Sequence, residues 1–149
     1  MADSEFTISD DKARLDLDVI HGFLSTAYWS KGIGRRRVAR AIEHSLCFGV
    51  YQSNGGQQVG FARVITDFTV MAHLLDVFIL EACRGRGLGK RLVAAALAHP
   101  ELRNIRRWSL ATDDAHDLYR SFGFSPLSEA QIRMTMQKLD PDAYNRPDP

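Results

Sequence analysis

The sequence predicts one α/β domain with a mixed, mostly antiparallel central sheet flanked by helices. The 149 residues suit a single core, and 45% hydrophobic with 25% charged residues is a globular balance. Segments with strand and helix periodicity follow in the order β-α-α-β-β-β-α-β-α-β. Hairpin-linked strands beside helix-linked strands require a mixed sheet. The domain should span residues 1–149, with its core at about 4–139 and a loose, proline-rich tail at 140–149.

The first half of the chain carries a strand, two helices and a hairpin. Residues 4–11 alternate and predict the first strand. Asp16 can cap a helix whose apolar residues recur at three- and four-residue intervals, namely Leu17, Ile20, Leu24 and Tyr28. Residues 35–45 predict a second amphipathic helix. Residues 46–52 and 58–66 predict strands joined through Ser-Asn-Gly-Gly, because asparagine and glycine tolerate positive φ.

The second half alternates strands with helices. The apolar run at residues 73–80 is typical of a central strand covered on both faces. Residues 88–99 predict a helix, residues 106–112 a strand and residues 115–122 a short helix. Residues 132–139 alternate well enough to predict a last strand.

The charge balance and the cysteine and histidine pattern narrow the functional classes. Nineteen basic and eighteen acidic residues nearly cancel, so we expect neither nucleic acid nor a membrane as partner. The start of the chain lacks a signal-like pattern and no apolar run approaches the ~18 residues of a membrane span, so a cytoplasmic protein is expected. Cys47, Cys83 and the five histidines show no metal-ligand spacing, and no metal site is predicted.

A glycine-rich basic loop precedes the helix at residues 88–99. It is not a Walker A loop, since Gly85 and Gly89 are separated by three residues rather than four. It is not a dinucleotide fingerprint, since Lys90 stands where the third glycine is needed. Glycines at a helix start let an anion approach the backbone amides, and the neighbouring basic side chains add charge, which suits a pyrophosphate. The alternative is a solvated turn with a basic rim.

Two motifs resemble those of the GNAT superfamily of acyl-CoA N-acyltransferases. The first, like the family's Arg/Gln-x-x-Gly-x-Gly/Ala signature, is Arg84-Gly85-Arg86-Gly87-Leu88-Gly89. The second, at residues 110–124, resembles the Thr…Ala-x-x-Leu-Tyr-x-x-x-Gly-Phe pattern. The resemblance covers about residues 4–139. It implies acetyl-CoA as co-substrate and a primary amine, on a small molecule or a peptide, as acceptor.

The resemblance also assigns cofactor-binding residues. It implies that the coenzyme A pyrophosphate is held by the loop Arg84, Gly85, Arg86, Gly87, Leu88, Gly89 and Lys90. The backbone of Val77, Phe78 and Ile79 should pair with the pantetheine arm like an added strand, in a gap between two diverging strands. Thr112 stands where many members have an asparagine that contacts the cofactor. A hydroxyl cannot reproduce the two bonds of an amide, so a Thr112 contact stays open.

Tyr119 matches the tyrosine that commonly protonates the departing thiolate in this family. A phenol and a thiol differ in pKa by ~1.5 units, a cost of ~2 kcal/mol that a site can offset. The alternative is a half-buried core aromatic beside Leu118 and Phe122.

Asp76 is the candidate base for the amine. A carboxylate inside an apolar strand is costly unless it is paired or faces a cleft. Strand alternation puts Asp76 on the same face as Phe78, near the expected position of the acetyl group. The alternative is a structural carboxylate bonded to Arg63 or to backbone amides.

The first helices and their connection should form the acceptor pocket, with candidates Tyr28, Trp29, Tyr51 and Phe61. A basic cluster at Arg35, Arg36, Arg37 and Arg40 would favour an acidic acceptor or be a solvated helix face. The sequence therefore favours an acetyl-CoA-dependent N-acetyltransferase with direct transfer, as monomer or homodimer. The alternatives are a non-catalytic CoA-binding or regulatory module and, against the near-neutral charge, an RNA binder.

Overall fold

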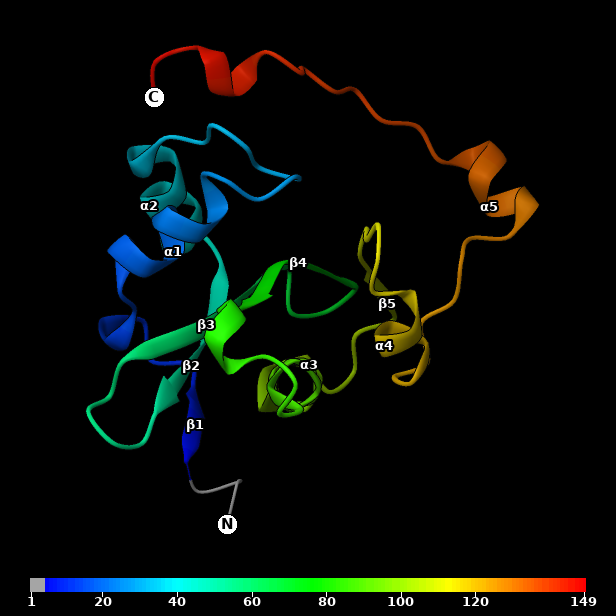
Figure 1. Ribbon diagram of the computed structural model, residues 1–149. Coiled ribbons are helices and arrows are strands. Elements are labelled where there is room, and N and C mark those ends of the chain that lie inside the picture. Colours follow the sequence, from blue (N-terminus) through cyan, green and yellow to red (C-terminus); the bar gives the residue numbers. More distant parts are fainter. Residues whose placement is uncertain (1–4) are drawn as a thin grey trace.

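A computed structural model describes residues 5–149, and its centre is a five-stranded sheet (Figure 1). The strands lie in chain order: β1 (Phe6–Ser9), β2 (Leu46–Gln52), β3 (Gln58–Thr66), β4 (Met71–Ile79) and β5 (Arg107–Ser109). Neighbours from β1 to β4 pair antiparallel, and β4 pairs parallel with β5. The predicted mixed, mostly antiparallel sheet is confirmed. Residue 4, the predicted start of the first strand, lies outside the described residues.

Helices cover both faces of the sheet. On one face, α3 (Leu88–Leu97) buries Leu88, Leu92, Val93 and Ala96 against the strands. On the other face, α1 (Leu17–Leu24) and α2 (Arg35–Glu43) enclose a second apolar cluster. Shorter helices follow β5, namely α4 (His116–Arg120) and α5 (Glu129–Met134). The described residues also form four short 3-10 segments: η2 (Lys12–Arg14), η3 (Glu81–Cys83), η4 (Pro100–Leu102) and η5 (Ala143–Asn145).

Helix α1 begins as predicted and ends earlier than predicted. The Asp16 carboxylate accepts from the amide of Asp18 at 3.0 Å and so caps the helix. The helix ends at Leu24 because two hydroxyl residues follow. Ser25 and Thr26 donate to the carbonyls of Gly22 and Phe23, and such bonds compete with the helical ladder. Tyr28 therefore lies in the connection to α2, away from the helical face on which its spacing placed it.

The predicted last strand at residues 132–139 is wrong. Ser128 and Gln131 form a capping box, in which each side chain accepts from the other's amide, and this starts α5. After α5 the chain runs back toward α2 without pairing with β5 (Figure 1). Its apolar side chains are exposed, including Met134 at 76% and Met136 at 93%. An alternating pattern makes a strand only where a neighbouring strand supplies ladder partners, and none of the described strands does so here.

Strands β4 and β5 diverge after a short contact. Only Met71–His73 of β4 pairs with Arg107–Ser109 of β5, while β4 continues to Ile79. A bulge lies in the diverging half, where the register with β3 shifts and Asp76 has a φ of 56°. The edge of β4 that faces β5 is therefore left without ladder partners from Leu74 onward, among the described residues. This divergence opens the site.

Candidate active site

A cleft of ≈ 410 Å³ occupies the gap between β4 and β5. Its walls come from residues 73–77 of β4, from residues 111–115 before α4, and from the connection between α1 and α2. The cleft brings together four of the predicted site residues, Asp76, Val77, Thr112 and Tyr119. The side chains of Phe78 and Ile79 instead pack in the two apolar clusters, so any role of theirs at the cleft belongs to the backbone.

Tyr119 joins the core to the cleft. Its ring is buried, with 8% exposed, and meets the Phe124 ring edge-on at 5.9 Å. Its hydroxyl has no hydrogen-bond partner within residues 5–149. Burial raises the pKa of Tyr119, with smaller contributions from Tyr28 and Asp114. The side chain therefore stays a neutral phenol, which is the state that can donate a proton.

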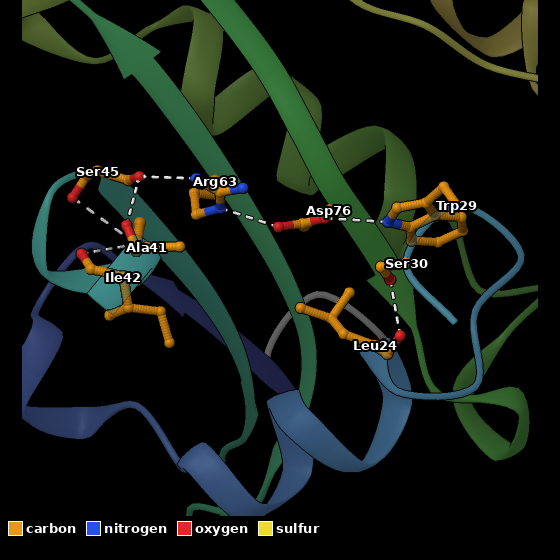
Figure 2. A network of polar contacts seen from close by, with 9 residues as sticks. Leu24, Trp29, Ser30, Ala41, Ile42, Ser45, Arg63 and Asp76 are labelled. Atoms are coloured by element: carbon orange, nitrogen blue, oxygen red, sulfur yellow. Dashed lines mark hydrogen bonds and ion pairs between the residues drawn. The ribbon is translucent and has the colours of Figure 1, made fainter. Parts of the chain in front are cut away.

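Asp76 holds a chain of polar contacts under the cleft (Figure 2). Its Oδ2 accepts from Arg63 Nε at 2.8 Å and its Oδ1 from Trp29 Nε1 at 2.9 Å. Arg63 also donates to Ser45 Oγ at 3.0 Å, and Ser45 donates to the Ala41 carbonyl of α2. Side chains of Arg63 and Asp76 are 12% and 10% exposed. The structural carboxylate that the sequence left open as an alternative matches these contacts.

The bulge keeps Asp76 on the face predicted for it. Phe78 and Phe61 belong to the cluster beneath α1 and α2, and Asp76 points toward the same helices (Figure 2). Regular alternation would place residues 74 and 77 on opposite faces of the strand, and the structure differs from it there. Leu74 and Val77 both contact the α3 side, so the extra bulge residue lies between them.

His73 lines the cleft and was missed in the sequence. Its Nδ1 lies 2.8 Å from Ser109 Oγ, across the last paired position of β4 and β5. Burial, and then the charge of Arg63, lowers the pKa of His73 below its ordinary 6.5. The ring is therefore neutral at pH 7 and able to accept a proton. The sequence carried no signal for it, because its partner is set by a strand pairing 36 residues away.

Thr112 lies in the cleft wall and organises the start of α4. Its Oγ1 accepts from the Ala115 amide at 3.1 Å. This bond turns the chain so that Tyr119, one helical turn into α4, reaches the cleft. The Thr112 hydroxyl proton is not donated to any of residues 5–149, so it is available to a ligand.

The glycine loop forms an uncapped helix start. Gly85 and Gly87 have φ of 79° and 75°, which favours glycine, and Gly87 is the N-cap residue of α3. No side chain of the described residues caps this helix, so its first amides are open to an anion. Such amides and the helix dipole favour a negative charge at this position.

The arginines of this loop have protein partners. Arg84 Nε donates to the Ile79 carbonyl at 2.9 Å, which ties the loop to the end of β4. Arg86 pairs with Glu5 at 3.2 Å, with both side chains about half exposed. Lys90 lies in the first turn of α3. The groups that this loop leaves open are therefore backbone amides, and the arginines add positive charge around them.

The other sequence candidates divide between cleft and core. Tyr28 and Trp29 line the cleft, whereas Tyr51 and Phe61 are buried in the core. Cys47 and Cys83 are buried free thiols. Within residues 5–149 no cluster of His, Cys, Asp or Glu has the makeup of a metal site, and no helix is long and apolar enough to cross a membrane.

Comparison with known proteins places this architecture among acetyltransferases. The family model described as the acetyltransferase (GNAT) domain matches residues 43–126. A solved structure from Xanthomonas campestris pv. campestris, assigned to the GNAT family, is 45% identical with a TM-score of 0.87. The match covers 95% of this chain and 97% of that one.

Two curated relatives carry related names. A Gibberella zeae protein named as an acetyltransferase is 27% identical, over 84% of this chain and 82% of its own length. Serotonin N-acetyltransferase 2 of rice (Oryza sativa subsp. japonica) is 30% identical over 85% of this chain. The chain spans 60% of the rice protein.

Proposed function

Because the chain belongs to the GNAT acetyltransferase family and is an acyltransferase, we propose that it transfers the acetyl group of acetyl-CoA directly to a primary amine. The observation that carries this proposal is the cleft between β4 and β5, which gathers a protonated phenol and a neutral imidazole beside an unpaired strand edge. The name of the rice relative specifies serotonin, but this chain spans 60% of that protein, so the similarity assigns no acceptor here.

The residues present fit acetyl-CoA as the co-substrate. The pyrophosphate fits the open amides from Gly85 to Lys90, where positive φ at two glycines turns the backbone and leaves no side chain in the way. The pantetheine amides fit the edge of β4 at Val77, Phe78 and Ile79, where β5 no longer pairs, although the Ile79 carbonyl already accepts from Arg84 Nε. We propose that Thr112 donates its hydroxyl proton to the same arm.

The acid in the proposed transfer is Tyr119. The amine nitrogen bonds to the thioester carbonyl carbon, the carbon–sulfur bond breaks, and the sulfur takes the Tyr119 proton. Proton transfer from a phenol to a thiolate costs free energy, and the raised pKa of Tyr119 increases this cost. The cost is offset if the thiolate forms in the same low-dielectric cleft, where its charge is also disfavoured.

The attacking neutral amine loses one proton, and we assign His73 to accept it. An acceptor that arrives as an ammonium first releases one proton to water. His73 is neutral at pH 7 and lines the cleft with Tyr119. Proton exchange with water then resets phenolate and imidazolium. We propose a different role for Asp76 from that of the predicted base, because both its oxygens already accept protein hydrogen bonds. We propose that Asp76 positions Trp29 over the cleft and neutralises Arg63.

Substitution of Tyr119 tests the proposal. Thiol release from acetyl-CoA is measured over small amines, amino acids, polyamines and peptides. Tyr119→Phe keeps the ring and its contact with Phe124, so acetyl-CoA affinity by calorimetry should hold, while kcat falls by roughly 10²–10⁴-fold.

The matched control is Tyr144→Phe, whose ring lies over Arg37 away from the cleft and should leave kcat unchanged. An unchanged kcat in Tyr119→Phe would show that Tyr119 is not the acid. If the wild-type protein binds acetyl-CoA but releases no thiol with any amine, the proposed acetyl transfer is wrong and a binding module is favoured.

A further inference from the structure

The connection between α1 and α2 forms an aromatic roof over the cleft, made by Tyr28 and Trp29. Both residues are exposed, Tyr28 at 60% and Trp29 at 39%. The two rings meet edge-to-face with centroids 5.0 Å apart, and both line the cleft. The roof is therefore a preformed π surface beside the reacting groups.

Polar contacts fix this roof on both walls of the cleft. Trp29 Nε1 donates to Asp76 of β4 at 2.9 Å (Figure 2). The Tyr28 hydroxyl accepts from the Asp113 amide at 3.0 Å, on the wall before α4. Because both polar atoms have protein partners, the exposed parts of the rings offer apolar surface to a ligand. Their anchoring also means that little rotamer entropy is lost when a ligand packs on them.

The charge of the cleft has one sign. Its lining contains Asp76, Asp113 and Asp114 and, among the described residues, no lysine or arginine. Asp76 is neutralised by Arg63, whereas Asp113 and Asp114 have no ion-pair partner within residues 5–149. Carboxylates at the mouth of a cleft attract a cation and repel an anion.

The basic cluster of the sequence does not reach this cleft. Arg35 pairs with Asp18 at 2.5 Å on the outside of α1 and α2. Arg37 lies over the Tyr144 ring and donates to the Ala143 carbonyl. None of the four arginines of that cluster lines the cleft, so an acidic acceptor has no counter-charge there.

We propose that the acceptor is an arylalkylamine, a flat aromatic ring on a short chain that ends in a primary ammonium, with no carboxylate. The ring packs against Tyr28 and Trp29, and Asp113 and Asp114 draw the ammonium in. This inference rests on the proposed acetyl transfer and adds the class of the acceptor. It follows from the roof and the charge of the lining, not from the glycine loop.

The test compares acceptors that differ in one feature. Thiol release is measured with phenethylamine, with its cyclohexyl analogue 2-cyclohexylethylamine, and with phenylalanine, which adds a carboxylate. The aromatic acceptor should exceed the cyclohexyl analogue in kcat/KM by roughly three- to tenfold, the effect of aromatic stacking. Phenylalanine should be poorer by at least about tenfold, because its carboxylate meets Asp113 and Asp114.

Variants assign these preferences to residues. Trp29→Leu should abolish the preference for the aromatic ring, whereas Trp29→Phe should keep it while losing the bond to Asp76. Phe68→Leu is the control, an exposed aromatic outside the cleft lining. Asp113→Asn should reduce the discrimination against phenylalanine. Its control is Asp117→Asn, whose carboxylate pairs with Arg120 on α4.

Two outcomes overturn the inferred acceptor class, and they differ in whether the proposed acetyl transfer is also rejected. Equal or better turnover of the cyclohexyl or carboxylated acceptor sinks the acceptor class and leaves acetyl transfer standing. No thiol release from any amine, despite bound acetyl-CoA, sinks the acceptor class and acetyl transfer together.

Discussion

The two ends of the cleft are built in different ways. The proposed cofactor end is made of consecutive residues, from the edge of β4 through the glycine loop into α3, and the groups that it offers to a ligand are backbone amides. The acceptor end is made of side chains from the α1–α2 connection, β3, β4 and the segment before α4, held by contacts such as Trp29–Asp76 and Tyr28–Asp113. Changes at the first end should act on ligand binding, and changes at the second on stability and selectivity.

The largest effect is expected from Arg63→Ala at the acceptor end. The substitution leaves the Asp76 carboxylate buried without its cation, which costs about 3–5 kcal/mol of unfolding free energy in urea denaturation. The control is Arg120→Ala, which breaks an exposed pair with Asp117 and should cost less than ~1 kcal/mol.

The double variant Arg63→Met with Asp76→Leu sharpens this prediction. It removes both charges and replaces them with apolar side chains, so part of the lost stability should return. The recovery is limited because leucine at position 76 must adopt a φ of 56°. Equal losses for Arg63→Ala and Arg120→Ala would show that the pair does not hold the acceptor end together.

At the cofactor end, Gly89→Val should act on binding and spare the fold. Gly89 has no positive φ, and no heavy atom lies within 4 Å of the position that a Cβ would take, so valine fits the free protein, unlike at Gly87 with its φ of 75°. The branched side chain blocks approach to the first amides of α3. Loss of about two charge-assisted bonds of ~1.5–3 kcal/mol each lowers acetyl-CoA affinity about a hundredfold or more by calorimetry.

Gly22→Ala is the matched control for this loop variant. Gly22 lies exposed in α1 with open space at its Cβ, so alanine should raise stability by about 0.5–1 kcal/mol and leave acetyl-CoA affinity unchanged. Normal affinity in Gly89→Val would mean that the diphosphate binds elsewhere.

The same contrast explains what the sequence predicted. The conformation of the proposed cofactor end could be predicted because it depends on neighbouring residues, two glycines with positive φ and a helix start. The binding of the cofactor there stays a prediction. The sheet was readable because β2 and β3 alternate on either side of a strong turn. The predicted fold class and all but the last of its elements were confirmed.

The acceptor end was not readable in the same way. The early end of α1, which places Tyr28 and Trp29 over the cleft, depends on two hydroxyls. The contact of His73 with Ser109 depends on the register between β4 and β5. The failed strand at residues 132–139 has the right alternation without a neighbour to pair with. Long-range partners decide such features, and one sequence does not show them.

A third prediction concerns pH and the core beneath the acceptor end. Cys47 of β2 is buried under α1 and α2, and burial raises the pKa of its thiol from 9.0 to about 11. Above pH 9 the unfolded chain loses this proton while the folded protein keeps it. Stability is therefore fully present below pH 9 and falls as the pH rises toward 11, by on the order of 2–3 kcal/mol.

Urea denaturation between pH 8 and pH 11 measures this slope. Burial also raises the pKa values of Tyr51 and Tyr119, which act in the same direction. Cys47→Ala therefore should reduce the slope without removing it, whatever its effect on stability at pH 8. An unchanged slope in Cys47→Ala would show that the thiol is not responsible.

The smallest effect concerns the N-terminal cap of α2, which is supplied by a residue distant in sequence and could be supplied by the N-cap residue itself. The N-cap residue Gly34 has no side chain, and the Asp148 carboxylate instead accepts from the amides of Arg36 and Arg37, at 2.9 and 3.2 Å. Asp148→Ala should cost about 1 kcal/mol, as for other lost caps. Gly34→Ser supplies a hydroxyl at the same amides from within the loop, with a backbone already extended as a cap requires.

These two substitutions should not add. In the wild type, a Cβ at Gly34 would collide with the Asp148 carboxylate, so Gly34→Ser should gain nothing or destabilise. In the Asp148→Ala background the space is free, and Gly34→Ser should restore most of the loss. Urea denaturation of the four proteins gives the coupling free energy. Equal effects of Gly34→Ser in both backgrounds would mean that residue 148 does not cap α2. The predicted rescue would show that this part of the acceptor end depends on a contact across 112 positions only because glycine stands at the cap.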